Sequence, residues 1–397
     1  MPRLPLQSRA LSLSLAASLA LLAGCSTNHS GRNTTNSTAS SNTSLASKAQ
    51  SVDIIAKLPT MPGNIAVSRD GRIFVSQHPF GNPTFRVVEV KPDGSQTPFP
   101  TAAWSAAPSA DGTGIAAIIG IEVDQRNRLW MLDAGGPTTP PKLLAWDLTA
   151  NTMAVNINLA AAAVAESFMQ DFAVDLTRNH VYIADIGGID PSLSQKPAIV
   201  VVNLTNGTAR RVLENHPALR AENVDMIVEG QPVQVKRPDG TIFRPRAGIN
   251  PITIDATDTN VYFGSMNGTA IWRVPAAALA DSTSLDLASR VQRWGTKGVS
   301  DGFNIDQQGN VYVTDLNTST ISVALAGEPR SAGYVPLTSA GSILRWPDGV
   351  SFGGDGNLYI VVNQLHKSST LNAGVDATTP PYIIARTKPI GPALLGR

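Results

Sequence analysis

Short apolar segments separated by tight polar turns recur along the chain from residue 51 onward. The clearest copy is Ser300–Asp315, S-D-G-F-N-I-D-Q-Q-G-N-V-Y-V-T-D, in which two apolar segments flank a turn and the second has a central aromatic. Runs of this length bounded by Gly, Asn and Asp are typical of β-hairpins. The pattern occurs six times, with the central aromatic at Phe74, Trp130, Tyr182, Tyr262, Tyr312 and Tyr359.

The repeat has a regular period. Successive central aromatics are 56, 52, 80, 50 and 47 residues apart. A period of about fifty residues built from strands alone predicts a radial array of small sheets that bury their faces against one another. Residues 51–397 are therefore predicted to form an all-β fold, a six-bladed β-propeller.

The two ends of this region predict how the ring closes. The last repeat, Asp348 to Val362, is followed by only one clear strand, Tyr382 to Arg386, so its blade lacks a fourth strand. A lone strand candidate, Val52–Leu58, precedes the first repeat. Because an open sheet edge is unfavourable, we expect this N-terminal strand to complete the last blade and close the ring.

The longest interval between repeats contains Pro217–Gly248, which has few alternating apolar positions and a K-R-P-D-G-T turn. We interpret this segment as an excursion over one face of the propeller. It either shapes a pocket or forms a surface loop.

The N-terminal 50 residues have a different character. Arg3, Arg9 and an apolar stretch precede L-A-G-C at Cys25, which resembles the cleavage site of bacterial lipoproteins. We expect residues 1–24 to be a signal peptide and Cys25 to be the lipidated residue, with an ordinary secretory signal as the alternative. Residues 25–50 are rich in Ser, Thr and Asn and are predicted to be a disordered tether. The predicted location is the bacterial cell envelope, as an outer-membrane lipoprotein facing the periplasm or the exterior.

Composition fits a strand-and-turn protein. The sequence is 42% hydrophobic and 15% charged, with 33 Gly and 28 Pro. A formal net charge of +1 gives no reason to expect nucleic-acid binding. The single cysteine excludes a disulfide within one chain. We expect a monomer attached to a membrane through its lipid.

Several motifs resemble the major royal jelly protein/Yellow family. They are R-L-W-M-L-D-A-G at 128–135, P-K-L-L-A-W-D-L at 141–148, V-Y-I-A-D at 181–185, A-R-R-V-L at 209–213, S-D-G-F-N-I-D at 300–306, and W-P-D-G-V-S-F followed by N-Q-L at 346–365. The resemblance covers nearly all of residues 51–397 and implies a six-bladed propeller. Its members are exported proteins associated with pigment chemistry, small-amine binding or nutrition. A more distant resemblance is to the gluconolactonase/senescence marker protein group.

Polar residues precede each central aromatic by about eleven positions, at the start of the first strand of each repeat. In a propeller this strand lines the central channel, so these side chains converge. Three carboxylates and two amides in one channel suit Ca²⁺, Mg²⁺ or Mn²⁺ as a cofactor. The alternative is that the Asp-Gly and Asn-x pairs only satisfy backbone donors at turns. The six positions are Asn64, Gly120, Asp171, Asn250, Asp301 and Asp348.

The resemblance to the lactonase group adds roles to these positions. It implies a divalent metal held by Asp171, Asn250 and Asp301, with Asp301 or Asp171 helping to activate water. Asn64 and Asp348 are then candidate ligand-binding residues. His78 and His366 directly follow second strands and are expected to reach the same face. Asp133, Asp185 and Asp315, which end second strands, are predicted to hold loops.

The sequence contains no G-x-S-x-G, P-loop or dinucleotide-binding motif. Two functions stay open: a lipid-anchored protein that binds a small molecule at the channel mouth, and a metal-dependent hydrolase of a lactone or ester. An envelope scaffold is permitted by any propeller, but no motif indicates one.

Overall fold

The computed structural model describes residues 49–327 and 333–397. Cys25, the predicted signal peptide and nearly all of the predicted tether lie outside these residues. Helices in the described part are short: α2 (Ala102–Ser105), α3 (Ala276–Ala280), η1 (Pro79–Gly81), η2 (Ala160–Ala162), η3 (Pro217–Leu219), η4 (Leu287–Arg290) and η5 (Leu365–Lys367). In this part of the chain no helix has the length and apolar character needed to span a membrane.

The strands form six antiparallel sheets of four, which are the blades. Blade one contains β2 (Pro62–Val67), β3 (Ile73–Gln77), β4 (Val87–Val90) and β5 (Gln96–Pro98). Blade two contains β6 (Ile118–Val123), β7 (Arg128–Asp133), β8 (Lys142–Asp147) and β9 (Thr152–Asn158). Blade three contains β10 (Met169–Asp175), β11 (His180–Asp185), β12 (Ala198–Asn203) and β13 (Thr208–Val212).

The second half of the ring follows the same plan. Blade four contains β18 (Ile249–Ile254), β19 (Asn260–Ser265), β20 (Ala270–Pro275) and β21 (Gln292–Thr296). Blade five contains β22 (Ser300–Ile305), β23 (Val311–Asp315), β24 (Thr320–Ala324) and β25 (Tyr334–Pro336). Blade six contains β26 (Pro347–Phe352), β27 (Leu358–Val362), β28 (Tyr382–Thr387) and β1 (Asp53–Leu58).

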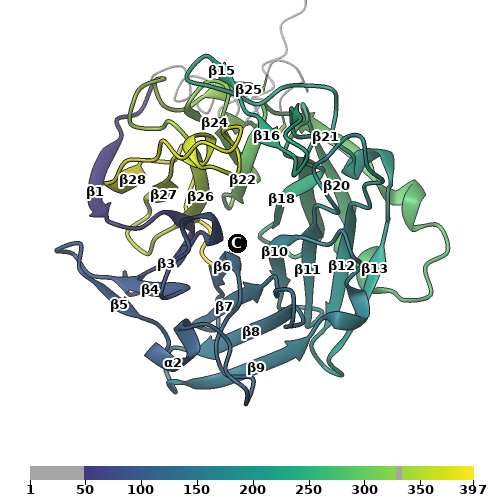
Figure 1. Cartoon of the computed structure of the whole chain (residues 1–397). Helices are drawn as coiled ribbons and strands as arrows, with labels where there is room; N and C mark the ends of the chain where they lie inside the picture. Colours follow the sequence, from purple (N-terminus) through teal and green to yellow (C-terminus); the bar gives the residue numbers. More distant parts are fainter. Residues whose placement is uncertain (1–48, 328–332) are drawn as a thin grey trace, which may run out of the picture. The chain divides into compact units, whose positions relative to one another are not determined.

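The first strand of each blade is the innermost. These six strands contact one another in the closed order β2, β6, β10, β18, β22, β26 and back to β2. Figure 1 shows the resulting ring of blades around a central axis. The predicted six-bladed propeller is therefore confirmed.

The N-terminal strand closes this ring. β1 pairs antiparallel with β28, from Asp53 opposite Arg386 to Leu58 opposite Tyr382. Leu58 is completely buried, whereas Ile54 on the same strand is 45% exposed. The predicted closure by Val52–Leu58 is correct to within one residue.

The central aromatics have a polar partner that the sequence pattern did not indicate. The indole nitrogen of Trp130 donates to Asp124 at 2.8 Å, and the hydroxyl of Tyr182 donates to Asp175 at 2.9 Å. Tyr312 and Tyr359 make the same contact, each at 3.0 Å, with Asp306 and Asp355 respectively. Each aspartate lies in or beside the turn between the first two strands. Since a buried hydroxyl or indole N–H needs a partner, the pair fixes turn and strand together in four blades.

The aspartates that end the second strands hold loops, as predicted. Asp133 accepts the backbone N–H groups of Ala116 and Ala117, both at 3.0 Å. Asp185 accepts Phe168 N–H at 2.7 Å, and Asp315 accepts the backbone N–H of Thr318 in the following turn at 3.1 Å.

Residues 217–248, here called the strap, connect blades three and four. The strap contains two small hairpins, β14 (Ile227–Val228) with β15 (Gln231–Pro232) and β16 (Val235–Lys236) with β17 (Ile242–Phe243). It is tied to three other parts of the ring. The ties are Arg237 to Asp190 at 2.6 Å, Ile227 N–H to Asn317 at 3.0 Å and Gln234 N–H to the carbonyl of Leu371 at 3.1 Å.

Candidate functional site

All six innermost strands carry a register shift at the same place. The shifts lie between Pro62 and Ile65, Ile118 and Ile121, Met169 and Asp171, Ile249 and Ile252, Ser300 and Phe303, and Pro347 and Val350. A β-bulge leaves a residue outside the ladder and re-aims its side chain. The six channel positions predicted from the sequence lie at these bulges, so they are strand irregularities and not turns.

Glycine follows two of these channel residues for a steric reason. A Cβ on Gly302 would lie 2.4 Å from the carbonyl oxygen of Asp348, and one on Gly349 would lie 1.8 Å from Oδ1 of Asn64. Neighbouring inner strands approach each other too closely there for any side chain. The displaced backbone is also satisfied, because Gly302 N–H donates to the hydroxyl of Thr314 at 2.7 Å.

Asp301 is the most heavily bonded channel residue. Its Oδ1 accepts the side-chain amides of Asn250 at 2.6 Å and Gln170 at 3.3 Å. Its Oδ2 accepts the indole N–H of Trp346 at 2.7 Å. Asp348 lies close enough for the charge of Asp301 to raise its pKa. An ionised carboxylate offers about four acceptor positions, and these three donors occupy most of them.

The pKa of Asp348 is raised more strongly than that of its neighbour Asp301. It is 4% exposed, and burial together with the charge of Asp301 raises its pKa well above the usual range. The pKa of Asp301 is also raised by burial, but the donors around it oppose the shift. Asn363 donates to Asp348 at 2.6 Å and holds the pair from the other side.

Lys297 provides a buried positive group near Asp301. Its ammonium group donates to the carbonyl oxygens of Gly268 and Gly298, both at 2.9 Å, and to the hydroxyl of Ser300 at 3.0 Å. Burial lowers the pKa of Lys297 to about 7, while nearby carboxylates, Asp301 among them, oppose the shift. Lys297 therefore offsets part of the negative charge below the pocket.

Asp171 and Asn64 lie in a separate, narrower part of the channel. They line a cavity of about 20 Å³ together with Glu122 and Arg397, among others. Burial raises the pKa of Asp171 to about 7 and that of Glu122 to about 8. No hydrogen bond among the described residues joins Asp171 to Asp301, although the charge of Asp301 also contributes to raising the pKa of Asp171.

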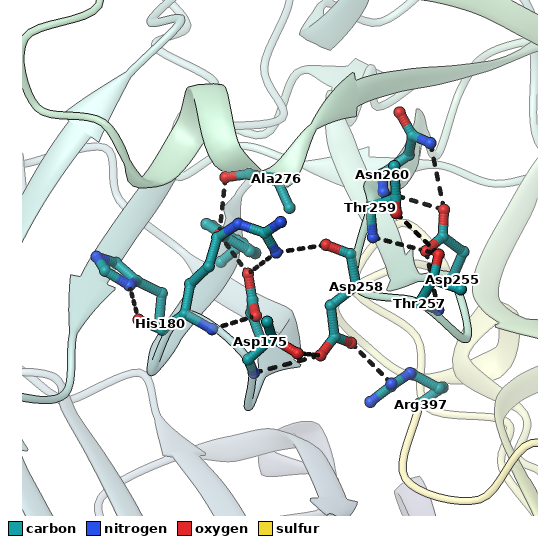
Figure 2. A network of polar contacts seen from close by, with 12 residues as sticks. Asp175, His180, Asp255, Thr257, Asp258, Thr259, Asn260, Ala276 and Arg397 are labelled. Carbon is teal, nitrogen blue, oxygen red and sulfur yellow. Dashed lines mark hydrogen bonds and ion pairs between the residues drawn. The ribbon is translucent and has the colours of Figure 1, made fainter.

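Arg397 lies at the far end of this narrow cavity. Its guanidinium donates to Oδ1 of Asp258 at 2.7 Å, a contact that Figure 2 shows within a network reaching Asp175. Its carbonyl accepts the amide of Asn304 at 2.6 Å. In Figure 1 the letter C, which marks the C-terminal end of the chain at Arg397, lies at the centre of the ring.

A larger pocket of about 280 Å³ opens on the other side of Asp301. Asp301, Gln170 and His78 are its polar residues, and the strap contributes Met226, Pro245 and Ala247. The remaining walls are almost entirely apolar. They are formed by Phe80, Ile119, Phe168, Ile186, Gly188, Ile189, Met266, Trp346, Leu365 and Leu371. The strap therefore shapes a pocket, which is the first of the two interpretations of Pro217–Gly248.

The two predicted histidines have different positions. His78 lines the pocket, whereas His366 lies behind Trp346 and is not among the lining residues. The imidazole of His366 contacts Oε2 of Glu229 on the strap at 3.0 Å. The structure thus brings His78 and Asp301 together at one pocket.

The predicted metal ligands hydrogen-bond to other channel side chains. Asn250 turns its amide nitrogen toward Asp301, which also accepts from Gln170 and Trp346. Oδ1 of Asn250 is buried without a partner, and Asp171 lines the narrow cavity. Among the described residues no group of three or more His, Cys, Asp or Glu could hold a metal ion. The predicted metal ligands Asp171, Asn250 and Asp301 stay a prediction.

Three residues of the site were missed at the sequence level. Gln170 directly precedes a channel residue, and the bulge turns both toward the channel. Trp346 lies next to the P-D-G of the last repeat, and Lys297 precedes the first strand of blade five. The usable signal was an unexpected polar residue, Gln170, next to the predicted channel residue Asp171.

Solved structures share the fold at low sequence identity. A gluconolactonase from Xanthomonas campestris superposes with a TM-score of 0.50 and 13% identity, covering 87% of this chain and 92% of that one. A luciferin-regenerating enzyme gives a TM-score of 0.52 at 13% identity, covering 88% and 98%. A calcium-binding regucalcin from Agrobacterium tumefaciens gives 0.50 at 11% identity, covering 88% and 98%.

Sequence relatives identify the family. Major royal jelly protein 3 of Apis mellifera is 26% identical over 184 residues, which are 43% of this chain and 30% of that protein. Major royal jelly protein 1 of the same species is 24% identical over 198 residues, 46% of this chain and 42% of that protein. The chain thus matches less than half the length of these relatives. The model of the family described as major royal jelly protein matches residues 116–389, so this chain belongs to the major royal jelly protein family.

Proposed function

We propose that this protein binds a small molecule in the pocket between Asp301 and the strap. The observation that carries this proposal is the pocket itself: about 280 Å³ of space with mostly apolar walls and a few polar lining residues. Binding sites for small molecules have this character, with volumes from about 300 Å³ upward.

The residues around the pocket support a preformed site. Trp346 is completely buried, and Asp301 is 2% exposed. The hydrogen bond between Trp346 and Asp301 fixes one wall of the pocket. The contacts of Arg237 and Ile227 with the ring fix the strap, which forms another wall. A pocket with fixed walls loses less conformational entropy when a ligand binds.

A pocket-filling variant tests the proposal. Ile189 is half-buried at the pocket wall, so Ile189→Trp should fill part of the space. Leu285→Trp, at a fully exposed site, is the matched control. Both variants and the parent protein are screened with a small-molecule library by protein-observed NMR. We expect hits that bind the parent and Leu285→Trp but not Ile189→Trp. Hits that bind all three equally would contradict binding in this pocket.

We also propose that the protein is exported and attached to a membrane through lipid on Cys25. The L-A-G-C sequence and the Ser/Thr/Asn-rich segment after it support this. A ligand site on such a protein would face the periplasm or the exterior of the cell.

Hydrolysis of a lactone or ester with a divalent cation is the alternative function. It is tested on a lactone panel with and without Ca²⁺ or Mn²⁺. Turnover that depends on the cation and is lost in Asp301→Asn would replace the binding proposal with a hydrolase.

A further inference from the structure

The polar groups that face the pocket differ in whether they are still available to a ligand. Three donors already occupy most of the acceptor positions of Asp301, as described above. An ammonium ligand would have to compete with them for a buried carboxylate. Lys297 already offsets part of the negative charge.

Gln170 presents an acceptor. Its Nε2 faces the Oδ1 of Asp301, and a carboxylate oxygen can only accept, so the nitrogen is assigned correctly. The amide oxygen, Oε1, must then point elsewhere, and no hydrogen bond to it occurs among the described residues. Gln170 lines the pocket and is 7% exposed.

His78 presents a donor. Its Nδ1 accepts the backbone N–H of Phe80 at 3.1 Å, so this nitrogen carries a lone pair. A neutral imidazole then has its single proton on Nε2. His78 is 3% exposed, and burial lowers its pKa to about 3, so the ring stays neutral. Its Nε2 has no hydrogen-bond partner among the described residues, and the side chain lines the pocket.

His78, Ile119 and Gln170 line the pocket from blades one, two and three respectively. A Cβ on Gly63 would lie 3.5 Å from Ile119 and 3.6 Å from His78, so these two side chains are close neighbours. The pocket therefore offers a neutral N–H donor, an apolar side chain and a neutral carbonyl acceptor.

We propose that the ligand of this pocket is an uncharged, largely apolar molecule whose hydroxyl or carbonyl group accepts a hydrogen bond from Nε2 of His78. A hydroxyl can in addition donate to Oε1 of Gln170. This inference rests on the proposed function, since it specifies the ligand class for the same pocket.

A matched series of probes tests the ligand class. Indane, 1-indanol, 1-indanone and 1-aminoindane share one bicyclic frame and differ in a single group. Binding to the purified protein is measured by isothermal titration calorimetry. We expect 1-indanol and 1-indanone to bind about two- to tenfold more tightly than indane, as one hydrogen bond would give. 1-Aminoindane should bind no more tightly than indane.

Two substitutions of His78 test the donor. In His78→Asn the side-chain oxygen can replace Nδ1 as the acceptor for Phe80, but the Nε2 donor is lost. In His78→Gln a donor reaches the position of Nε2, but the acceptor near the backbone is lost. We expect the preference for 1-indanol over indane to disappear in His78→Asn and to persist in His78→Gln. Indane binding in each variant reports whether the pocket is intact.

The outcomes separate this inference from the proposed function. Tightest binding of 1-aminoindane would overturn the uncharged ligand class and leave small-molecule binding in place. A hydroxyl preference retained in His78→Asn would overturn the role of His78. Failure of all four probes to bind the parent protein would overturn both.

Discussion

The indole ring of Trp346 lies parallel to the imidazole ring of His366, with their centroids 5.9 Å apart and an angle of 2° between their planes. The indole N–H donates to Asp301, and the imidazole contacts Glu229 at the turn between β14 and β15. These contacts link Asp301, which lines the pocket, to the strap, which forms another wall of the pocket. A change at either end is therefore expected to reach the other.

Replacing Trp346 by Phe should destabilise the protein. The phenyl ring keeps the stacking on His366 but removes a donor from a buried carboxylate, which typically costs about 1–3 kcal/mol. Urea unfolding gives the change in free energy. Trp272→Phe, at a half-buried tryptophan on β20, is the control and should cost less. Equal costs in the two variants would argue against a special role for the bond to Asp301.

Glu229 should make the strap sensitive to acid. Lys367, His366 and Arg345 surround its carboxylate at 2.9, 3.0 and 3.2 Å, and hydrogen bonds from Lys367 contribute most to lowering its pKa to about 2. Because the folded-state pKa is below the usual value, the carboxylate stabilises the fold above about pH 4.5. This contribution is lost as the pH falls toward 2.

The matched variant for this prediction is Glu229→Gln. Since Glu229 is partly exposed, its contribution should stay below about 1 kcal/mol at neutral pH. Urea unfolding of both proteins at several pH values should show the difference shrinking between pH 4.5 and 2. A difference that is constant over this range would mean that the charge on Glu229 does not matter.

Leu58 should contribute more to ring closure than its neighbour on the same strand. Leu58→Ala removes a fully buried side chain and should cost about 2–5 kcal/mol. Ile54→Ala, at the exposed side of β1, should cost less than about 1 kcal/mol. Thermal unfolding of the two variants measures the contrast. Similar melting temperatures would show that β1 does not hold the last blade.

Cys25→Ser should release the protein from membranes. Without the thiol no lipid can be attached, so the chain should move to the soluble fraction and lose labelling by a fatty-acid probe. Fractionation and labelling of cells expressing either form measure this. Membrane association of Cys25→Ser equal to that of the parent would mean that another part of the chain provides the attachment.

Added Ca²⁺ should leave the melting temperature unchanged. In the arrangement described here, a cation would have to compete with Gln170, Trp346 and Asn250 for Asp301. Calorimetry with chelator and then with Ca²⁺ or Mn²⁺ tests this. A rise in melting temperature that is absent in Asp301→Asn would instead support the cation site predicted from the sequence.

The ring was predictable because its information is local and repeated. Each hairpin can be recognised from its apolar segments and its turn residues, so the six copies support the same interpretation. The closing strand followed from counting strands in the last blade, since a missing edge requires a partner. The bulges were not predictable, because a one-residue shift leaves no mark on the apolar pattern.

The site was predictable only in part, and for a related reason. Asp301 and Asp348 stand out as aspartates at strand starts. Whether such a carboxylate binds a cation, takes up a proton or accepts a hydrogen bond from an amide depends on side chains from other blades. Gln170 reaches Asp301 across 131 positions of sequence, and a single sequence does not record such pairings.

The narrow end of the channel has a consequence for ligand traffic. The cavity between Asp171 and Arg397 has room for about one water molecule, so a molecule in the pocket above cannot pass through it. Entry and exit then share the mouth beneath the strap. Ligand binding and release would then use the same opening, which makes the propeller a cup and not a conduit.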